Sequence, residues 1–166
     1  MGINTWCIVA GSSIKWANKV YPDMSDSEAV EALWNAIFKA VKVVDDDPLT
    51  AWQEHRKSFE ARVAYLNKLN LNTLTYTNSL GTNLTVTLNE GYLFAGGGSY
   101  TTKGQYFFPN MPTEEIFTSP YRNGTNGVVY SSLPLNYNGN LIDEFKMEFK
   151  DGRIIDFDAT MGKEVL

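Results

Sequence analysis

The sequence has little of the two residue types that most often bind metals or form covalent links. Its 166 residues include one cysteine, Cys7, and one histidine, His55. A single cysteine excludes an intrachain disulfide and a zinc site made of cysteines. A single histidine excludes a metal site built from several imidazoles and a triad with a second histidine in reserve. The chemistry open to this chain is therefore severely limited.

An excess of positive charge and a long apolar run are also missing. The net charge is −5 and the isoelectric point is near 4.9. Because nucleic acids and anionic membranes bind basic surfaces, this charge argues against both as main partners. No apolar run approaches the roughly 18 residues of a membrane span. The start, Met1–Trp6, lacks the features of a signal peptide, so we expect a cytoplasmic protein.

The first 70 residues predict a short strand and then helices. The apolar run Thr5–Ala10 is typical of a buried strand. Residues 14–20 fit one or two helical turns. Ser25 and Glu28 form a capping-box pattern. Apolar residues then recur with helical spacing, which predicts an amphipathic helix with one apolar stripe: Val30, Leu33, Trp34, Ile37, Phe38 and Val41.

A second amphipathic helix is predicted after the acidic connection Asp45–Asp47. Asp47 is a favourable N-cap and Pro48 a favourable first helical residue, and the pattern continues to about Leu69. His55 lies on or near the apolar face of this helix. Because His55 has no metal-binding partner at i+4, we interpret it as a partly buried structural residue.

From residue 71 onward, polar and apolar residues alternate in short runs. Thr73–Thr77 and Leu84–Leu88 flank a turn and predict a β-hairpin. Asn138-Gly139 and Asp151-Gly152 are further hairpin-turn pairs. The triplet Gly96–Gly98 lacks the helix and the Lys-Ser/Thr tail of a phosphate loop, which favours a flexible turn.

The predicted fold class is therefore α+β. A short N-terminal strand and two amphipathic helices precede a mostly antiparallel β region that forms a curled sheet or a barrel-like structure. We expect two parts. Residues 1–70 hold the strand and the helical segment, and residues 71–166 hold the antiparallel β region with its Pro-Thr-Glu-Glu segment.

The stretch Asn110–Pro120 is the best candidate for chemistry. It places two adjacent carboxylates, Glu114 and Glu115, between two prolines that stiffen the backbone. A carboxylate here can be a metal ligand or a general base. Alternatively, both can lie in the first turn of a short helix capped by Thr113. The residues alone leave capping and chemistry about equal. On an extended chain the two carboxylates would point to opposite faces, so only one would face a site.

Several stretches resemble the metal-dependent aminopeptidases of the aminopeptidase T and aminopeptidase S type. Asn110–Pro120 is similar to that family's N-[IM]-P-T-E-E-[VI]-F-T-x-P signature. Other similar stretches follow in chain order: Ala29–Lys39, Asp47-Pro48, Ala51–His55, Tyr76-Thr77, Gly81–Thr85 and Pro134–Ile142. The resemblance therefore runs over nearly the whole chain.

Members of that family are exopeptidases that remove N-terminal residues from peptides. They use a two-metal site, with zinc or cobalt commonly implied, and they form homodimers. The resemblance places one metal ligand in this chain, the second Glu of Pro-Thr-Glu-Glu, which is Glu115. Glu114 takes that role if the match to the family signature is shifted by one residue. The resemblance assigns no catalytic residue within this chain.

The departures from the family pattern affect the expected activity. The family's other ligands (a Glu, two His and an Asp) and its active-site tyrosine lie downstream of the part that this chain resembles. Its N-terminal α/β lobe lies upstream. Asn83 stands where the family usually has Asp, but that Asp is not a ligand. The resemblance therefore implies the central fragment of a dinuclear metalloaminopeptidase. Alone, we expect it to be inactive and without metal. For the parent protein, the resemblance implies a peptide substrate and a homo-oligomer.

A second function remains open. The chain can be a non-catalytic β-rich interaction or dimerisation domain that retains the aminopeptidase scaffold. The two readings share the predicted fold and differ in whether Glu115 binds a metal.

Overall fold

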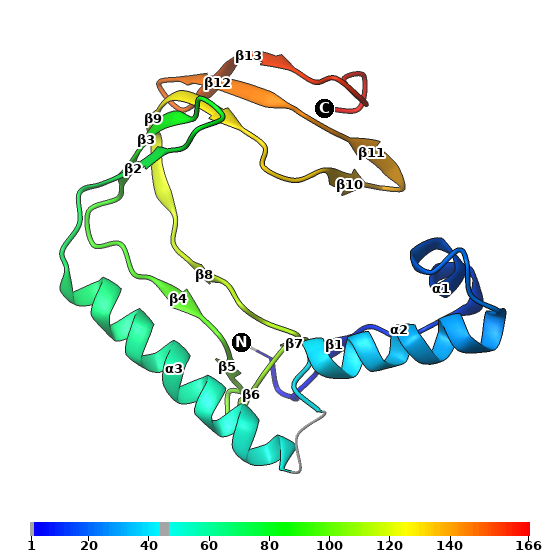
Figure 1. Cartoon of the computed structure of the whole chain (residues 1–166). Helices are drawn as coiled ribbons and strands as arrows, with labels where there is room; N and C mark the ends of the chain where they lie inside the picture. The colour runs from blue at the N-terminus through cyan, green and yellow to red at the C-terminus, as the bar shows by residue number, and fades with distance from the viewer. Residues whose placement is uncertain (1, 44–46) are drawn as a thin grey trace. The chain divides into compact units, whose positions relative to one another are not determined.

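The helices come first in the chain, and most of the strands follow. The computed structural model describes residues 2–43 and 47–166 (Figure 1). These residues divide into two compact units, and the grouping does not follow chain order. The first unit contains residues 1–68 and Phe94–Phe117, and the second contains Leu69–Leu93 and Thr118–Leu166.

The first unit contains the helices and a set of very short strands. The helices are α1 (Ile14–Val20), α2 (Asp26–Ala40) and α3 (Pro48–Lys68). Six strands in this unit have two residues each: β1 (Ile8–Val9), β4 (Ala95–Gly96), β5 (Ser99–Tyr100), β6 (Tyr106–Phe107), β7 (Asn110–Met111) and β8 (Ile116–Phe117). In Figure 1, β4 runs beside α3.

Helix α2 forms where the capping pattern and the apolar stripe predict it. The Ser25 backbone N–H donates to the Glu28 carboxylate at 3.1 Å, which satisfies one of the free N–H groups at the start of the helix. Part of the stripe is buried in a small core formed by Ala17, Ala29, Leu33, Ile37 and Val41, and Met111 packs against it. Phe38 is 40% exposed and stacks on Trp34 instead. The core therefore ties β7 to α2.

Helix α3 also begins where the sequence predicts. The Thr50 N–H donates to the Asp47 carboxylate at 3.1 Å, so Asp47 acts as the N-cap. The buried residues of this helix are His55 and Phe59. The other acids of the predicted connection, Asp45 and Asp46, lie outside the described residues.

The N-terminal strand differs from its prediction. Strand β1 forms, but Ile8 and Val9 are 63% and 62% exposed, so the expectation of a buried strand is wrong for the described chain. The reason is that β1 has a single neighbour among the described strands. It pairs with β7, and the pairing is parallel.

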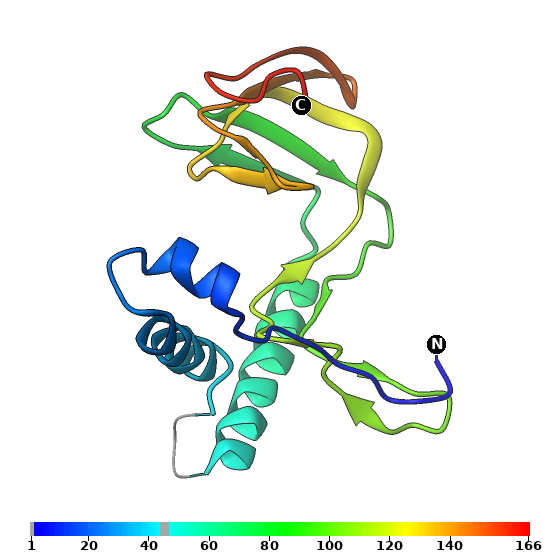
Figure 2. The ribbon, with the colours of Figure 1, turned by 90° about the vertical axis from the view of Figure 1, so that its right-hand side faces the viewer.

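The second unit is organised around an open sheet. Its strand order is β13-β12-β9-β3-β2, and every neighbouring pair is antiparallel. The long strand β9, coloured yellow in Figure 2, is central. The strands are β2 (Thr73–Thr77), β3 (Asn83–Leu88), β9 (Pro120–Tyr130), β12 (Lys146–Lys150) and β13 (Arg153–Asp158). A hairpin of β10 (Leu135–Tyr137) and β11 (Asn140–Ile142) completes the unit.

The predicted hairpins are confirmed at their turns. Asn138-Gly139 joins β10 to β11, and Asp151-Gly152 joins β12 to β13. All four residues have positive φ, as a two-residue hairpin turn requires.

The mixed α and β class is also confirmed. The barrel-like alternative is not, because β13 and β2 are the two edges of the sheet and are not paired with each other in the described chain. The division into residues 1–70 and 71–166 stays a prediction. None of the helices in the described part of the chain is long and apolar enough to cross a membrane.

Candidate functional site

Strands hold the Pro-Thr-Glu-Glu segment at both ends within the first unit. Before it, β7 pairs with β1, and the Ile8 N–H donates to the Pro109 carbonyl at 2.8 Å. After it, β8 pairs antiparallel with β4, so that Ile116 lies opposite Gly96. Met111 lies in β7 and is therefore extended, the conformation that a following proline favours. The two glutamates therefore lie in a short connection between two anchored strands.

The helix-capping interpretation of this segment is wrong. Residues 113–115 have no regular secondary structure, and β8 begins at Ile116. Thr113 is 7% exposed. Its carbonyl lies 2.8 Å from His55 Nε2. The backbone bonds outward to a distant helix instead of starting a helical turn of its own.

His55 is a side chain of α3 that contacts the segment. It is 9% exposed. Because a carbonyl oxygen can only accept, Nε2 carries the proton and donates to Thr113. The ring makes edge contacts with Trp52 at 5.3 Å and with Phe59 at 4.9 Å between ring centroids. The burial and the backbone bond agree with the interpretation of His55 as a structural residue.

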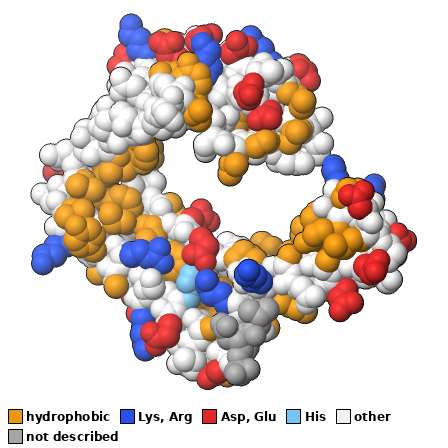
Figure 3. Space-filling view, viewed as in Figure 1, with side chains coloured by type: hydrophobic (Ala, Val, Ile, Leu, Met, Phe, Trp, Pro, Cys, Tyr) orange, Lys and Arg blue, Asp and Glu red, His pale blue; other side chains and the backbone are white. Residues whose placement is uncertain are grey.

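The two glutamates have different surroundings. Glu114 Oε1 lies 3.4 Å from Lys42 Nζ and 3.6 Å from His55 Nε2. Glu115 is exposed and has no ion pair or side-chain hydrogen bond within the described residues. In Figure 3, acidic and basic side chains gather around the single histidine, coloured pale blue. Glu114 is thus engaged with the protein, and the Glu115 carboxylate is available to a ligand.

Gly96, the first residue of the glycine triplet, lies against the same segment. A Cβ atom on Gly96 would lie 2.5 Å from the Glu115 carbonyl oxygen, closer than side-chain carbons approach other atoms in proteins. A Cβ on Gly97 would lie 2.9 Å from the Phe59 ring. Gly96 therefore permits close packing of β4 on the segment, and Gly97 permits close packing against α3. Sequence reasoning treated the triplet as a turn and missed this role, because its partners are remote in the chain.

Lys42 was missed for a similar reason. It follows α2, whereas Glu114 lies between β7 and β8, and no local pattern connects them. A lone lysine after a helix is common, so the sequence contains no signal that would have selected it.

The residues present fit one part of a metal site. Divalent metals such as zinc accept carboxylate oxygens, and the Glu115 carboxylate is free to act in this way. Within the part of the chain that the structure describes, no three His, Cys, Asp or Glu side chains are grouped so that they could hold a metal. The segment therefore matches the contribution of one ligand.

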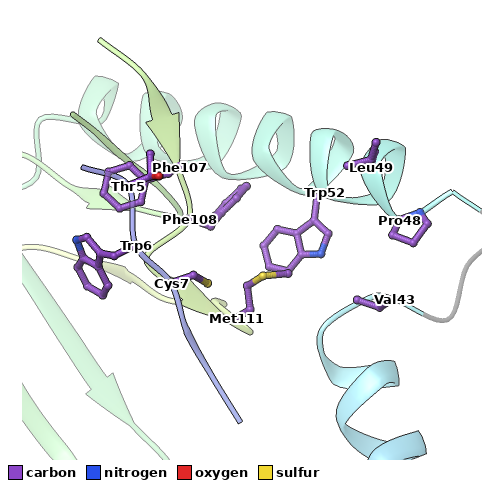
Figure 4. Close-up of a pocket in the computed structure, with 10 residues that line it drawn as sticks. All are labelled: Thr5, Trp6, Cys7, Val43, Pro48, Leu49, Trp52, Phe107, Phe108 and Met111. Carbon is purple, nitrogen blue, oxygen red and sulfur yellow. The ribbon is translucent and has the colours of Figure 1, made fainter. Parts of the chain in front are cut away.

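A separate apolar pocket of about 530 Å³ lies in the first unit (Figure 4). Trp52, Phe108 and Met111 line it together with Cys7, and no acid or histidine is among its described lining residues. Burial raises the pKa of the Cys7 thiol, which keeps it protonated and weakly nucleophilic near neutral pH. The described lining of the pocket is suited to apolar groups.

The fold and the segment are those of a metal-dependent peptidase family. Residues 1–166 match the family described as thermophilic metalloprotease (M29), and the chain belongs to this family. The resemblance to aminopeptidases T and S that the sequence indicates is thereby confirmed.

Curated relatives and a solved structure agree with this assignment. The chain is 43% identical to aminopeptidase 2 of Geobacillus stearothermophilus over 98% of its own length and 39% of that protein. It is 41% identical to aminopeptidase T of Thermus aquaticus over 99% of its length and 40% of that protein. It aligns with wild-type AmpT from Thermus thermophilus at a TM-score of 0.87 and 39% identity, covering 96% of this chain and 38% of that one. The chain thus spans about two fifths of the length of these relatives.

Proposed function

We propose that this chain supplies one metal ligand, Glu115, to a dinuclear metal-dependent aminopeptidase that removes N-terminal residues from peptides. The observation that carries the proposal is the exposed Glu115 carboxylate, which has no partner within the described residues although its backbone is anchored on both sides. Membership of a metalloprotease family and the aminopeptidase names of the relatives support the reaction.

The role of the protein groups follows from their geometry. When bound, a pair of zinc or cobalt ions would polarise the scissile carbonyl and lower the pKa of a bound water toward neutrality. Glu115 would hold one of these ions. The ion pair with Lys42 would keep the Glu114 carboxylate turned away, so that one carboxylate faces the metals.

The 166 residues alone should not catalyse the reaction. One carboxylate cannot hold a metal pair, and the relatives are more than twice as long as the part that matches. We expect the remaining ligands to come from regions of the full-length protein that correspond to the unmatched part of the relatives. Peptides as substrates, a homo-oligomeric state and a cytoplasmic location belong to the same proposal.

Exposed apolar surface supports association with further protein. Ile8 and Val9 are more than half exposed on a parallel pair of strands, and parallel strands are ordinarily covered on both faces. Such surface is buried in most folded proteins by another domain or subunit.

The test compares two single substitutions in the full-length protein. Substitution of a residue that only supports a metal ligand lowers metal affinity or activity about 10- to 100-fold. Glu115→Gln, which changes a ligand itself, should therefore lower aminoacyl-anilide hydrolysis with added zinc or cobalt by about 100-fold or more. Glu114→Gln is the matched control and should retain activity within about tenfold. The melting temperature of both variants should stay within a few degrees of the wild type. This corresponds to a change in the free energy of unfolding of about 1 kcal/mol or less.

Three results would contradict the proposal. If Glu114→Gln abolishes hydrolysis and Glu115→Gln does not, Glu114 is the ligand. If neither variant loses activity, the segment holds no metal. If melting falls by many degrees in Glu115→Gln while activity is kept, Glu115 is structural.

The alternative is a non-catalytic β-rich interaction or dimerisation domain. The exposed apolar residues of the edge strand β13, Ile154 at 51% and Ile155 at 55%, favour it, because exposed edges pair with other chains. The reading frame after Leu166 separates the two functions. A Glu, a His and a closely spaced His-x-Asp would favour the enzyme, and a stop codon would favour the interaction domain.

A further inference from the structure

We infer that His55 is a positioning residue for Glu115, and that it acts through the carbonyl of Thr113. The inference rests on the proposed role of Glu115 as a metal ligand. His55 itself does not contact the metals in this account. It fixes the backbone from which the Glu115 side chain extends.

The bond between His55 and Thr113 connects parts of the first unit that are far apart in sequence. The two residues are separated by 58 positions, and Nε2 lies 2.8 Å from the carbonyl oxygen. His55 is 9% and Thr113 is 7% exposed, so water cannot readily replace either partner. Thr113 precedes Glu115 by two residues. Rotation of the intervening peptide groups would break a buried hydrogen bond.

The imidazole is itself held in place. Trp52 and Phe59 meet it edge-on, with interplanar angles of 88° and 85°. The Trp52 indole N–H donates to the Val41 carbonyl at 2.9 Å, which connects α3 to the end of α2. The imidazole N–H that donates to the Thr113 carbonyl is therefore preorganised.

Two further contacts fix the rest of the segment. Glu114 lies near both Lys42 and His55, which turns its side chain toward the protein. Gly96 leaves no room for a Cβ atom against the Glu115 carbonyl, so β4 closes on the segment from the other end. The peptide groups on both sides of the glutamates are thus constrained. Metal ligands bind well when residues behind them hold their geometry.

A purely structural role predicts a different outcome, and substitutions can separate the two. In the full-length protein, His55→Phe keeps an aromatic ring and removes the donor. His55→Gln keeps an N–H near the position of Nε2. Ile142→Ala is the control for lost packing, because Ile142 is 1% exposed and belongs to the second unit, whereas His55 and Thr113 belong to the first.

The readouts are zinc affinity by chelator competition, the visible absorption of the cobalt-substituted protein, and kcat and KM. We expect His55→Phe to weaken zinc binding about 10- to 100-fold, to alter the cobalt spectrum and to lower kcat more than KM. His55→Gln should restore most of the affinity. Ile142→Ala should lower the melting temperature and leave zinc affinity and the cobalt spectrum unchanged.

Two outcomes would overturn the inference. Zinc affinity and a cobalt spectrum in His55→Phe that equal those of the wild type would exclude a positioning role. Equal losses of affinity in His55→Phe and Ile142→Ala, at equal losses of melting temperature, would show that His55 is only structural. If His55→Phe does not fold, His55→Asn takes its place, since the shorter amide cannot reach Thr113.

The measurement of zinc affinity by chelator competition also separates this inference from the proposed function. If Glu115→Gln binds zinc as the wild type does, the proposed function fails. If Glu115→Gln loses zinc while His55→Phe retains it, only the role of His55 is wrong.

Discussion

Residues 94–117, which include the Pro-Thr-Glu-Glu segment, and the five-stranded sheet of the second unit are both built from strands. They are held in different ways. The sheet has strands of five to eleven residues, and two of its pairs, β2 with β3 and β12 with β13, join neighbours in the sequence. Residues 94–117 have strands of two residues, and their decisive contacts reach His55 and Lys42. Extended strand pairing makes a scaffold, whereas the remote contacts hold the residues next to Glu115.

Two glycines test this difference most strongly. Gly96 faces the Glu115 carbonyl. Gly152 lies in the hairpin turn between β12 and β13, has a φ of +75° and faces the carbonyl of Arg122 in β9. Substitution of either glycine by Ala should destabilise the full-length protein by about 1–3 kcal/mol, because the new Cβ crowds a backbone oxygen. Only Gly96→Ala should also weaken zinc binding. Thermal unfolding and chelator competition measure the two effects.

The glycine comparison has a clear contrary result. If Gly152→Ala lowers zinc affinity as much as Gly96→Ala at the same loss of melting temperature, metal binding follows general stability. The separation between a scaffold and a positioned segment would then be wrong.

A smaller effect is expected at the exposed ion pair beside the segment. The Lys42 and Glu114 side chains are 36% and 57% exposed, and pairs of this kind contribute less than about 1 kcal/mol. Lys42→Met should therefore change the free energy of unfolding by less than about 1 kcal/mol in a urea titration. A loss of several kcal/mol would mean that the pair carries more of the segment's stability than its exposure permits.

The smallest effect concerns the start of α2, away from the segment. Hydrogen bonds from the Ser25 hydroxyl and backbone N–H lower the pKa of Glu28 in the folded protein. A carboxyl with a lowered folded-state pKa adds stability above its unfolded pKa, and this is lost as pH falls through the folded value. Melting curves of Glu28→Gln and the wild type should therefore converge as the solution becomes acidic. If the difference in melting temperature between Glu28→Gln and the wild type persists at low pH, the ionised Glu28 of the capping box is not its cause.

The parts of the fold that could be predicted from sequence are those set by local patterns. Capping residues located α2 and α3, and the Asn-Gly and Asp-Gly pairs located two hairpins. The exposed strand β1 could not be anticipated, because an apolar run shows what can be buried and does not show what covers it. The pairing of β1 with β7 joins residues about a hundred positions apart, which no local pattern reports.

The candidate site was predictable only in part. Proline spacing and the acid pair selected Asn110–Pro120, but they could not decide between a helix cap and an extended connection. The backbone bond from His55 and the ion pair with Lys42 decide it, and both partners lie on or beside helices far from the segment in sequence. The sequence could name the two glutamates, and the structure shows which of them is engaged with the protein.

The most direct test of the central claim is a zinc-edge anomalous map of the crystalline full-length protein. We expect a zinc peak about 2.0–2.2 Å from a carboxylate oxygen of Glu115 and no zinc bound to Glu114. A peak bound by Glu114, or a metal pair with neither glutamate as a ligand, would contradict it.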